Sequence, residues 1–259
     1  MTSKSVAIVV LLLASGLIGN GQVTGNVTSR VFELRVAGGA GTGFFIEYQG
    51  QEYLITANHI VAALGEQARV EFLYDRTWHP LNVKVLHGES QCNDVAVLIP
   101  QQKERVLPST IDALPWTNSF LLGQDAYFLG FPYGLAVQSD KLHITLPIIK
   151  HAYISAMIPC SEFDPALPAD QNFMLLDGFN NAGFSGGPVV SRDQSDPQRT
   201  FKILAVIHGY RFDNTPLSVN GRRALNASVE TNTGIILAVP FEAALDLIRK
   251  TKRGGNAKP

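Results

Sequence analysis

The clearest chemical signal in the sequence is a serine set among glycines at 183–188, GFSGGP. Glycines allow a tight turn and a close approach of the backbone to a ligand. Backbone amides in such a turn can converge on a negatively charged oxygen, as acyl transfer requires. A serine hydroxyl is a weak nucleophile without a general base. Ser185 is therefore a candidate nucleophile if a base and an acid exist elsewhere, and otherwise the motif fits a plain surface turn.

A candidate base and a candidate acid both lie upstream. His59 stands in the segment 54–61, LITANHIV, and Asp94 opens the apolar run of 93–99, NDVAVLI. That run would bury the Asp94 carboxylate, and a buried carboxylate needs a partner such as imidazole. The order His, Asp, Ser predicts a catalytic triad in which Ser185 attacks, His59 is the base and Asp94 holds its tautomer.

Four segments together resemble the trypsin-like (chymotrypsin-fold, PA clan) serine peptidases: 41–45 (GTGFF), 56–59 (TANH), 93–97 (NDVAV) and 183–188. The resemblance is closest to the simple HtrA and glutamyl-endopeptidase types. It covers the chain from about 31 to about 250, which leaves no room for an appended PDZ domain. It implies a serine endopeptidase that acts on proteins or peptides through an acyl-enzyme. It also implies an oxyanion hole made by the amides of Gly183 and Ser185, and neither a metal nor any other cofactor is expected.

The coarse pattern of the chain favours strands. Short alternating or apolar runs recur between turn residues, in keeping with 23 glycines and 14 prolines. Six runs suit a small barrel at about 31–100, a polar linker follows at 101–116, and a second series covers about 117–240. The helical spacing of 241–250, just after Pro240, predicts a C-terminal helix.

The two-barrel expectation comes from the resemblance. It implies an all-β fold of two six-stranded antiparallel β-barrels with a C-terminal α-helix, within a peptidase domain spanning 31–250. His59 and Asp94 would belong to the first barrel and Ser185 to the second, so the site would assemble in the cleft between them.

Two positions depart from the trypsin pattern. Phe184 stands where trypsin-type zymogens carry an aspartate that pairs with the freshly cut N-terminus, so we expect a site that forms without such a cleavage. Phe179, six residues before Ser185, occupies the specificity position, so a preference for Arg or Lys is not implied. Asn181 is a candidate brace for this loop.

The substrate-side strand is expected at 203–210, followed by a long polar loop to 233. His208, Gly209, Tyr210 and Arg211 are the candidate substrate-binding residues. The segment 206–209 resembles the one in which glutamyl endopeptidases place a histidine against an acidic P1 side chain, and Arg211 would add positive charge. The alternative is a histidine of the cleft wall without a role in selectivity.

Composition bounds the partners and the compartment. A net charge of −1 gives no reason to expect nucleic acid or an anionic membrane as a partner. Lys4 precedes a short apolar run that small residues then dilute, so residues 1–21 predict a secretory signal rather than a stable membrane span. An uncleaved anchor and a buried N-terminal strand are the rival interpretations. We therefore expect a secreted or periplasmic protein, and its oligomeric state is left open.

The two cysteines, Cys92 and Cys160, allow at most one disulfide, and the sequence leaves open whether they form it. Neither lies in a histidine-paired motif, so buried free thiols or incidental residues are expected rather than nucleophiles.

Two other functions remain as alternatives. A pseudoprotease-like module would keep the fold and hold peptide in the cleft, with Phe184 distorting the oxyanion hole. An esterase is suggested by G-x-S-x-G at 183–187, but Pro188 opposes the helix that an α/β-hydrolase needs there, and the downstream His208 and Asp213 come in the wrong order.

Overall fold

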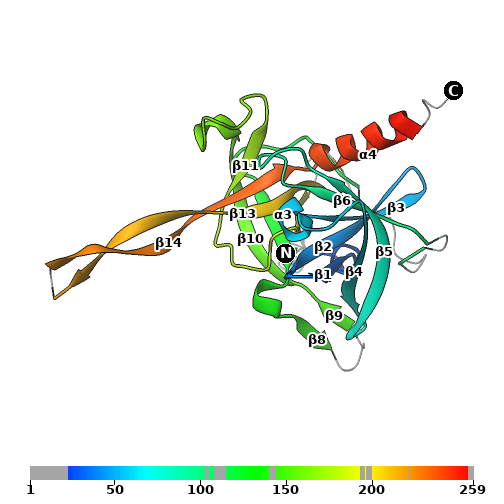
Figure 1. Ribbon diagram of the computed structural model, residues 1–259, viewed down its shortest axis with the longest axis horizontal. Coiled ribbons are helices and arrows are strands. Elements are labelled where there is room, and N and C mark those ends of the chain that lie inside the picture. Colours follow the sequence, from blue (N-terminus) through cyan, green and yellow to red (C-terminus); the bar gives the residue numbers. More distant parts are fainter. Residues whose placement is uncertain are drawn as a thin grey trace, which may run out of the picture.

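The computed structural model describes residues 23–102, 105–107, 115–139, 144–192, 196, 200–220 and 222–255. The expected signal segment, 1–21, lies outside these residues. Two closed antiparallel barrels form the body of the molecule (Figure 1). The prediction of two six-stranded barrels and a C-terminal helix is confirmed.

The first barrel follows a short helix, α2 (Gly25–Thr28), and has the strand order β1-β2-β3-β6-β5-β4. Its strands are β1 (Val31–Val36), β2 (Gly39–Tyr48), β3 (Gln51–Thr56), β4 (Gln67–Tyr74), β5 (Thr77–His87) and β6 (Ala96–Pro100). Inside it, the rings of Phe32, Phe45 and Phe72 meet edge to face with centroids 5.4–5.6 Å apart. Such aromatic contacts fill the small barrel and give its strands a fixed inner face.

The second barrel has the order β10-β11-β14-β13-β12-β7. Its strands are β7 (Asp125–Gly130), β10 (Ile148–Pro159), β11 (Asn172–Asp177), β12 (Pro188–Arg192), β13 (Phe201–Val219) and β14 (Arg222–Pro240). A separate hairpin pairs β8 (Val137–Ser139) with β9 (Ile144–Leu146), and two short 3-10 turns are η2 (Pro132–Gly134) and η3 (Cys160–Glu162). The helix α4 (Glu242–Gly255) follows β14 and extends further than the sequence pattern indicates.

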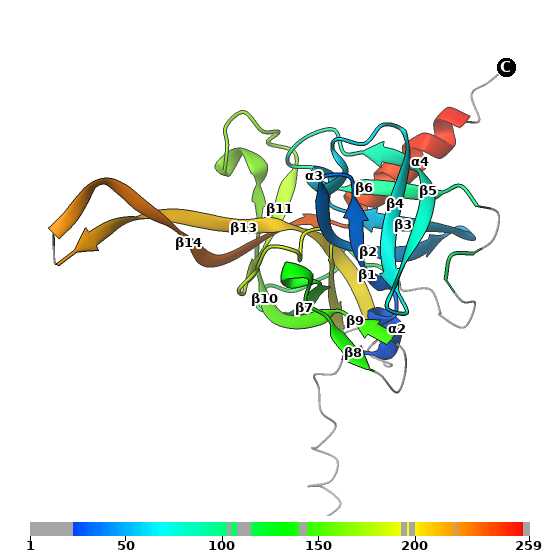
Figure 2. The same ribbon diagram turned by 60° about the horizontal axis from the view of Figure 1, so that its bottom comes forward.

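The sequence prediction of a polar loop after Tyr210 is wrong. Strands β13 and β14 instead pair from the barrel out to Val219 and Arg222 and form a long twisted ribbon that projects from the body (Figures 1 and 2). Its polar composition gave no burial pattern, and cross-strand pairing of the backbone does not require one. The ribbon exposes Phe212 and Val229.

A disulfide joins the two barrels. Cys92, in the loop between β5 and β6, is bonded to Cys160, the first residue of η3 directly after β10, and their Cα atoms are 6.0 Å apart. The cysteines are therefore neither free thiols nor nucleophiles. Whether they pair was open from the sequence, and folding brings together these two residues separated by 68 positions. Cys92 lies two residues before Asp94, so the link holds the acid loop of the first barrel against the second.

None of the helices within the described residues has the length and apolar character needed to cross a membrane.

Candidate active site

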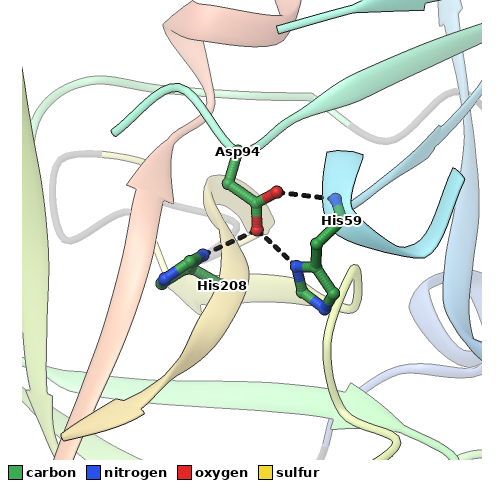
Figure 3. A group of neighbouring side chains, drawn as sticks. All are labelled: His59, Asp94 and His208. Atoms are coloured by element: carbon green, nitrogen blue, oxygen red, sulfur yellow. Dashed lines mark hydrogen bonds and ion pairs between the residues drawn. The ribbon is translucent and has the colours of Figure 1, made fainter. Parts of the chain in front are cut away.

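His59 and Asp94 come from adjacent segments of the first barrel. His59 lies in α3 (Asn58–Val61), a single turn that starts directly after β3, and Asp94 precedes β6, the neighbour of β3 in the sheet. The His59 amide donates to Asp94 Oδ1 at 2.7 Å, and its ring Nδ1 lies 2.6 Å from Asp94 Oδ2 (Figure 3). Both carboxylate oxygens thus fix the base, one through the backbone and one through the ring.

A second imidazole shares the same carboxylate. His208, on β13 of the second barrel, places its Nδ1 2.6 Å from Asp94 Oδ2, the oxygen that also contacts His59 (Figure 3). The His208 ring stacks on Phe173 with centroids 5.3 Å apart and meets the His59 ring edge to face at 6.0 Å. This contact between His208 and Asp94 was not foreseen from the sequence.

The electrostatics of Asp94 favour its charged form. Burial by itself raises the pKa of Asp94, but the hydrogen bonds and charges of His208 and His59 more than offset it, so the pKa lies below its ordinary value. An ionised carboxylate can only accept hydrogen bonds. Both Nδ1 atoms therefore carry the proton, and in a neutral ring each Nε2 keeps its lone pair.

Ser185 lies in a tight loop that ends where β12 begins. Gly183 has a φ of +103° and Gly186 a φ of +83°, which favour glycine. A β-carbon on Gly183 would clash with the Phe131 carbonyl oxygen, and one on Gly186 with that of Thr42. Within the part of the chain that the structure describes, the amides of Gly183 and Ser185 have no hydrogen-bond partner. They are therefore free to bind an oxyanion.

Thr42 of the first barrel holds this loop in place. Its hydroxyl donates to the Gly183 carbonyl at 2.6 Å and accepts from the Phe131 amide at 3.1 Å. Its amide donates to the Ser185 carbonyl at 2.9 Å, and its own carbonyl accepts from the Thr56 hydroxyl at 2.8 Å. The hydroxyl and the amide of Thr42 thus link the two barrels, while its carbonyl is bonded within the first. The sequence motif GTGFF contains Thr42 but does not by itself reveal this role.

Lys150 holds the loop from the other side. Its ammonium group donates to the Phe179 carbonyl and, at 2.9 Å, to Asn181 Oδ1, and it lies 5.7 Å from the centre of the Phe184 ring. Burial lowers the pKa of Lys150 below its ordinary value. Phe184 is fully buried and meets Phe128 edge to face at 4.9 Å. The loop is therefore anchored by an apolar ring and a lysine of β10, the latter unforeseen from the sequence.

The candidate nucleophile, Ser185, contacts the backbone of His208 but is not hydrogen-bonded to His59. The Ser185 hydroxyl donates to the His208 backbone carbonyl at 3.2 Å. No hydrogen bond connects the hydroxyl of Ser185 to the ring of His59, two residues that the structure describes in full. Catalytic hydrogen bonds are often long or poorly aligned without substrate, so this geometry is compatible with catalysis.

The other residues expected to bind substrate differ in their exposure and contacts. The Phe179 side chain is 57% exposed, and the guanidinium of Arg211 lies 5.6 Å from the centre of the Phe163 ring. Gly209 and Tyr210 continue β13 beyond His208 and pair with Leu237 and Ile236 of β14.

Comparison with known proteins decides the family. The family model described as "Trypsin-like peptidase domain" matches residues 41–195, more than half of the chain. The chain belongs to the trypsin-like peptidase family. The enzyme class that follows from this membership is serine endopeptidase. No curated protein matches the chain.

Solved structures share the fold of this trypsin-like peptidase. Rv3671c from M. tuberculosis H37Rv matches with a TM-score of 0.55 and 17% identity over 93% of each chain. The HtrA-type protease AlgW matches with a TM-score of 0.55 and 20% identity over 89% of this chain and 62% of its own. The serine endoprotease from Yersinia pestis matches with a TM-score of 0.51 and 19% identity over 91% and 69%. This chain thus spans less than two thirds of the AlgW chain.

Proposed function

We propose that this trypsin-like peptidase hydrolyses peptide bonds with a Ser185–His59–Asp94 triad, through an acyl-enzyme. The observation that carries the proposal is the double contact of His59 with Asp94, beside a serine loop with two free amides. Asp94 is ionised and fixes the Nδ1–H tautomer of His59, which leaves Nε2 as the base.

The steps follow from these atoms. Ser185 Oγ attacks the substrate carbonyl carbon while His59 Nε2 takes the hydroxyl proton. The carbonyl oxygen gains negative charge and binds the amides of Gly183 and Ser185. The C–N bond then breaks, and His59 returns the proton to the leaving amine. A water molecule, deprotonated by His59, attacks the acyl-enzyme; the bond from Ser185 Oγ to the acyl carbon breaks, and His59 returns the proton to Oγ.

In this proposal the resting and the reacting site differ in the hydrogen-bond partner of the Ser185 hydroxyl. The Ser185 hydroxyl must leave the His208 carbonyl and turn to His59 Nε2. Because the carbonyl belongs to the substrate-side strand β13, a bound peptide that uses the same carbonyl would release the hydroxyl. Substrate binding and activation of the nucleophile are thereby coupled in this proposal.

For the substrate we propose a protein or peptide laid along His208, Gly209 and Tyr210, with Phe179 beside the P1 side chain. An acidic P1 residue would be favoured by the doubly protonated form of His208, in which Nδ1–H donates to Asp94 and Nε2–H is left to donate to the substrate carboxylate. Arg211 would add positive charge. A peptide library without any preference for Glu or Asp at P1 would remove this part of the proposal.

We also propose that the protein acts outside the cytoplasm, secreted or periplasmic. The disulfide between Cys92 and Cys160 supports this, because such bonds persist in oxidising compartments. Sequencing the N-terminus of the mature protein from culture fluid or periplasm tests it. An unprocessed chain found only in the cytoplasm would contradict export.

Active-site titration tests the function. An activated ester should release a burst of leaving group equal to the enzyme concentration, because acylation of Ser185 precedes slow deacylation. The Ser185→Ala variant should give no burst and should lose peptide hydrolysis. Equal hydrolysis by both proteins would show that Ser185 is not the nucleophile.

A pseudoprotease that binds peptide without cleaving it is the second candidate. The missing hydrogen bond between the Ser185 hydroxyl and His59 in the described structure is the observation that favours it. This candidate requires tight peptide binding by the wild-type protein with no burst and no cleaved product after prolonged incubation.

A further inference from the structure

We propose that His59, Asp94 and His208 form a binding site for a zinc-class dication, and that the bound ion inhibits the enzyme. Metal binding needs only these three side chains. Inhibition rests, in addition, on the function proposed above, in which His59 is the base. Such an ion would be an inhibitor, and the hydrolytic chemistry itself requires none.

The three residues converge as metal ligands do. One donor atom from each lies within 4.8 Å of the other two, and no other group of three His, Cys, Asp or Glu within the described residues does so. Asp94 presents Oδ2 to both imidazoles through their Nδ1 atoms, each at 2.6 Å (Figure 3). Two imidazoles and one carboxylate, with a water molecule in the fourth position, are a donor set typical of tetrahedral zinc.

The site can open by the small amount that an ion needs. Zinc bonds to nitrogen and carboxylate oxygen of about 2.0–2.2 Å place tetrahedral ligand atoms about 3.3 Å apart. Each Nδ1 must therefore move about 0.7 Å away from Oδ2, starting from 2.6 Å. The His59 side chain is 47% exposed and the His208 side chain 30%, whereas that of Asp94 is 6% exposed. The accessible imidazoles can move while the buried carboxylate stays in place.

The positions of the imidazole protons explain why the ion would inhibit the enzyme. In the resting site each Nδ1 carries a proton toward the ionised Asp94. A metal ion needs the Nδ1 lone pair, so each ring must shift its proton from Nδ1 to Nε2 and no proton is released. His59 Nε2 then carries a hydrogen and cannot accept the proton of Ser185. The metal thus locks His59 in the tautomer that cannot act as the base.

The ligand types set the selectivity. Imidazole nitrogens suit zinc and its transition-metal neighbours, whereas magnesium and calcium prefer all-oxygen sites. We therefore expect zinc to bind and inhibit, and magnesium at the same concentration to do neither.

The first measurement is zinc binding to the Ser185→Ala protein by calorimetry, which has a readout independent of turnover. We expect one site per chain, lost in a His208→Asn variant. Asparagine keeps an N–H that can donate to Asp94, so the fold of the site is preserved while a zinc ligand is removed. The matched control is His151→Gln, which removes an exposed imidazole paired with Asp125 on the surface and should leave binding unchanged.

The second measurement is inhibition of hydrolysis, with each variant compared to its own metal-free rate. We expect zinc to inhibit the wild-type enzyme reversibly, with relief by a chelator, and His208→Asn to need at least about tenfold more zinc. Unchanged stoichiometry and affinity in His208→Asn would overturn the site. Zinc bound at His208 by an enzyme that hydrolyses equally fast would overturn the inhibition. An inactive wild-type protein that still binds zinc at His208 would instead count against the proposed function alone.

Discussion

The catalytic residues of the two barrels differ in whether their hydrogen bonds are already those that the reaction needs. In the first barrel, His59 and Asp94 are joined through both carboxylate oxygens. In the second, the Ser185 hydroxyl is bonded to a carbonyl of its own barrel, at His208. The pair of His59 and Asp94 is thus already assembled in the resting protein. The Ser185 hydroxyl must still leave the His208 carbonyl before it can bond to His59.

This difference indicates what each barrel is built to do. A base must have its tautomer fixed before the reaction, which the hydrogen bond that the His59 ring Nδ1 donates to the buried Asp94 carboxylate achieves. A nucleophile must be released when substrate arrives, which a single bond to a substrate-side carbonyl permits. Thr42 and Lys150 then keep the oxyanion amides in position while the hydroxyl turns. Changes in the first half should therefore cost more than changes in the supports of the second.

The largest effect after loss of the nucleophile is expected at Asp94. An Asp94→Asn variant keeps the shape of the site but no longer fixes the Nδ1–H tautomer of His59, and we expect kcat to fall about 10⁴-fold. Steady-state kinetics with a fluorogenic peptide measure it. A fall of less than tenfold in a folded variant would mean that Asp94 does not serve His59.

The same variant tests the lowered pKa of Asp94. Because its pKa lies below the ordinary value of about 3.9, the contacts with His59 and His208 stabilise the fold above that pH. This contribution is lost as the pH falls through the lower folded value. Denaturant unfolding between neutral and acid pH should show a steeper loss of stability for the wild type than for Asp94→Asn, and parallel curves would contradict the assignment.

Next in size is the oxyanion loop. Gly183→Ala places a β-carbon against the Phe131 carbonyl at a positive φ, so the Gly183 peptide must reorient. Loss of one oxyanion donor should lower kcat about 10²- to 10³-fold. Gly50→Ala is the matched control, because Gly50 has a φ of +76° and open space around it in the turn between β2 and β3. A full-strength Gly183→Ala enzyme would rule out this oxyanion hole.

A smaller effect is expected at Lys150. Lys150→Met removes the ammonium that binds Phe179 and Asn181, and we expect kcat to fall about tenfold, or about 1.4 kcal/mol in activation free energy, with KM changing less. Lys150→Arg should restore most of the rate.

The lowered pKa of Lys150 adds a pH signature to this test. The charged amine donates the stronger hydrogen bonds, so the brace weakens as the pH rises through a value below that of an exposed lysine. The alkaline fall in kcat should move to higher pH in Lys150→Arg, because arginine stays charged. An alkaline limb that is the same in both proteins would assign it to another group.

The smallest effect on rate is expected from the disulfide between the barrels. A Cys92→Ser, Cys160→Ser double variant should keep the hydrogen bonds around Asp94 and most of its activity. Its free energy of unfolding should fall by about 4 kcal/mol, because the bond closes a loop between residues 68 positions apart. A variant as stable as the wild type but with much less activity would make the disulfide a positioning device instead.

The four short motifs predicted the fold through their resemblance to trypsin-like peptidases, whereas composition and periodicity indicated only a chain rich in strands. The sequence also predicted a triad of Ser185, His59 and Asp94. The contacts join His59 to Asp94, and the role of Ser185 as nucleophile stays a prediction. The sequence could not predict that His208 reaches Asp94, since the pairing depends on how β13 of one barrel packs against a loop of the other. The same holds for Lys150 and for the disulfide, whose partners are distant in sequence. The β13–β14 ribbon was mistaken for a loop because its polar strands bury no face.

The most direct test of the account is covalent labelling of the nucleophile. A fluorophosphonate reacts with a serine only when a base activates it and an oxyanion hole receives the phosphoryl oxygen. Mass spectrometry of the labelled protein should find one adduct, on Ser185, with the rate strongly reduced in His59→Ala. An unlabelled Ser185 in the folded wild-type protein, or labelling at the same rate without His59, would contradict it.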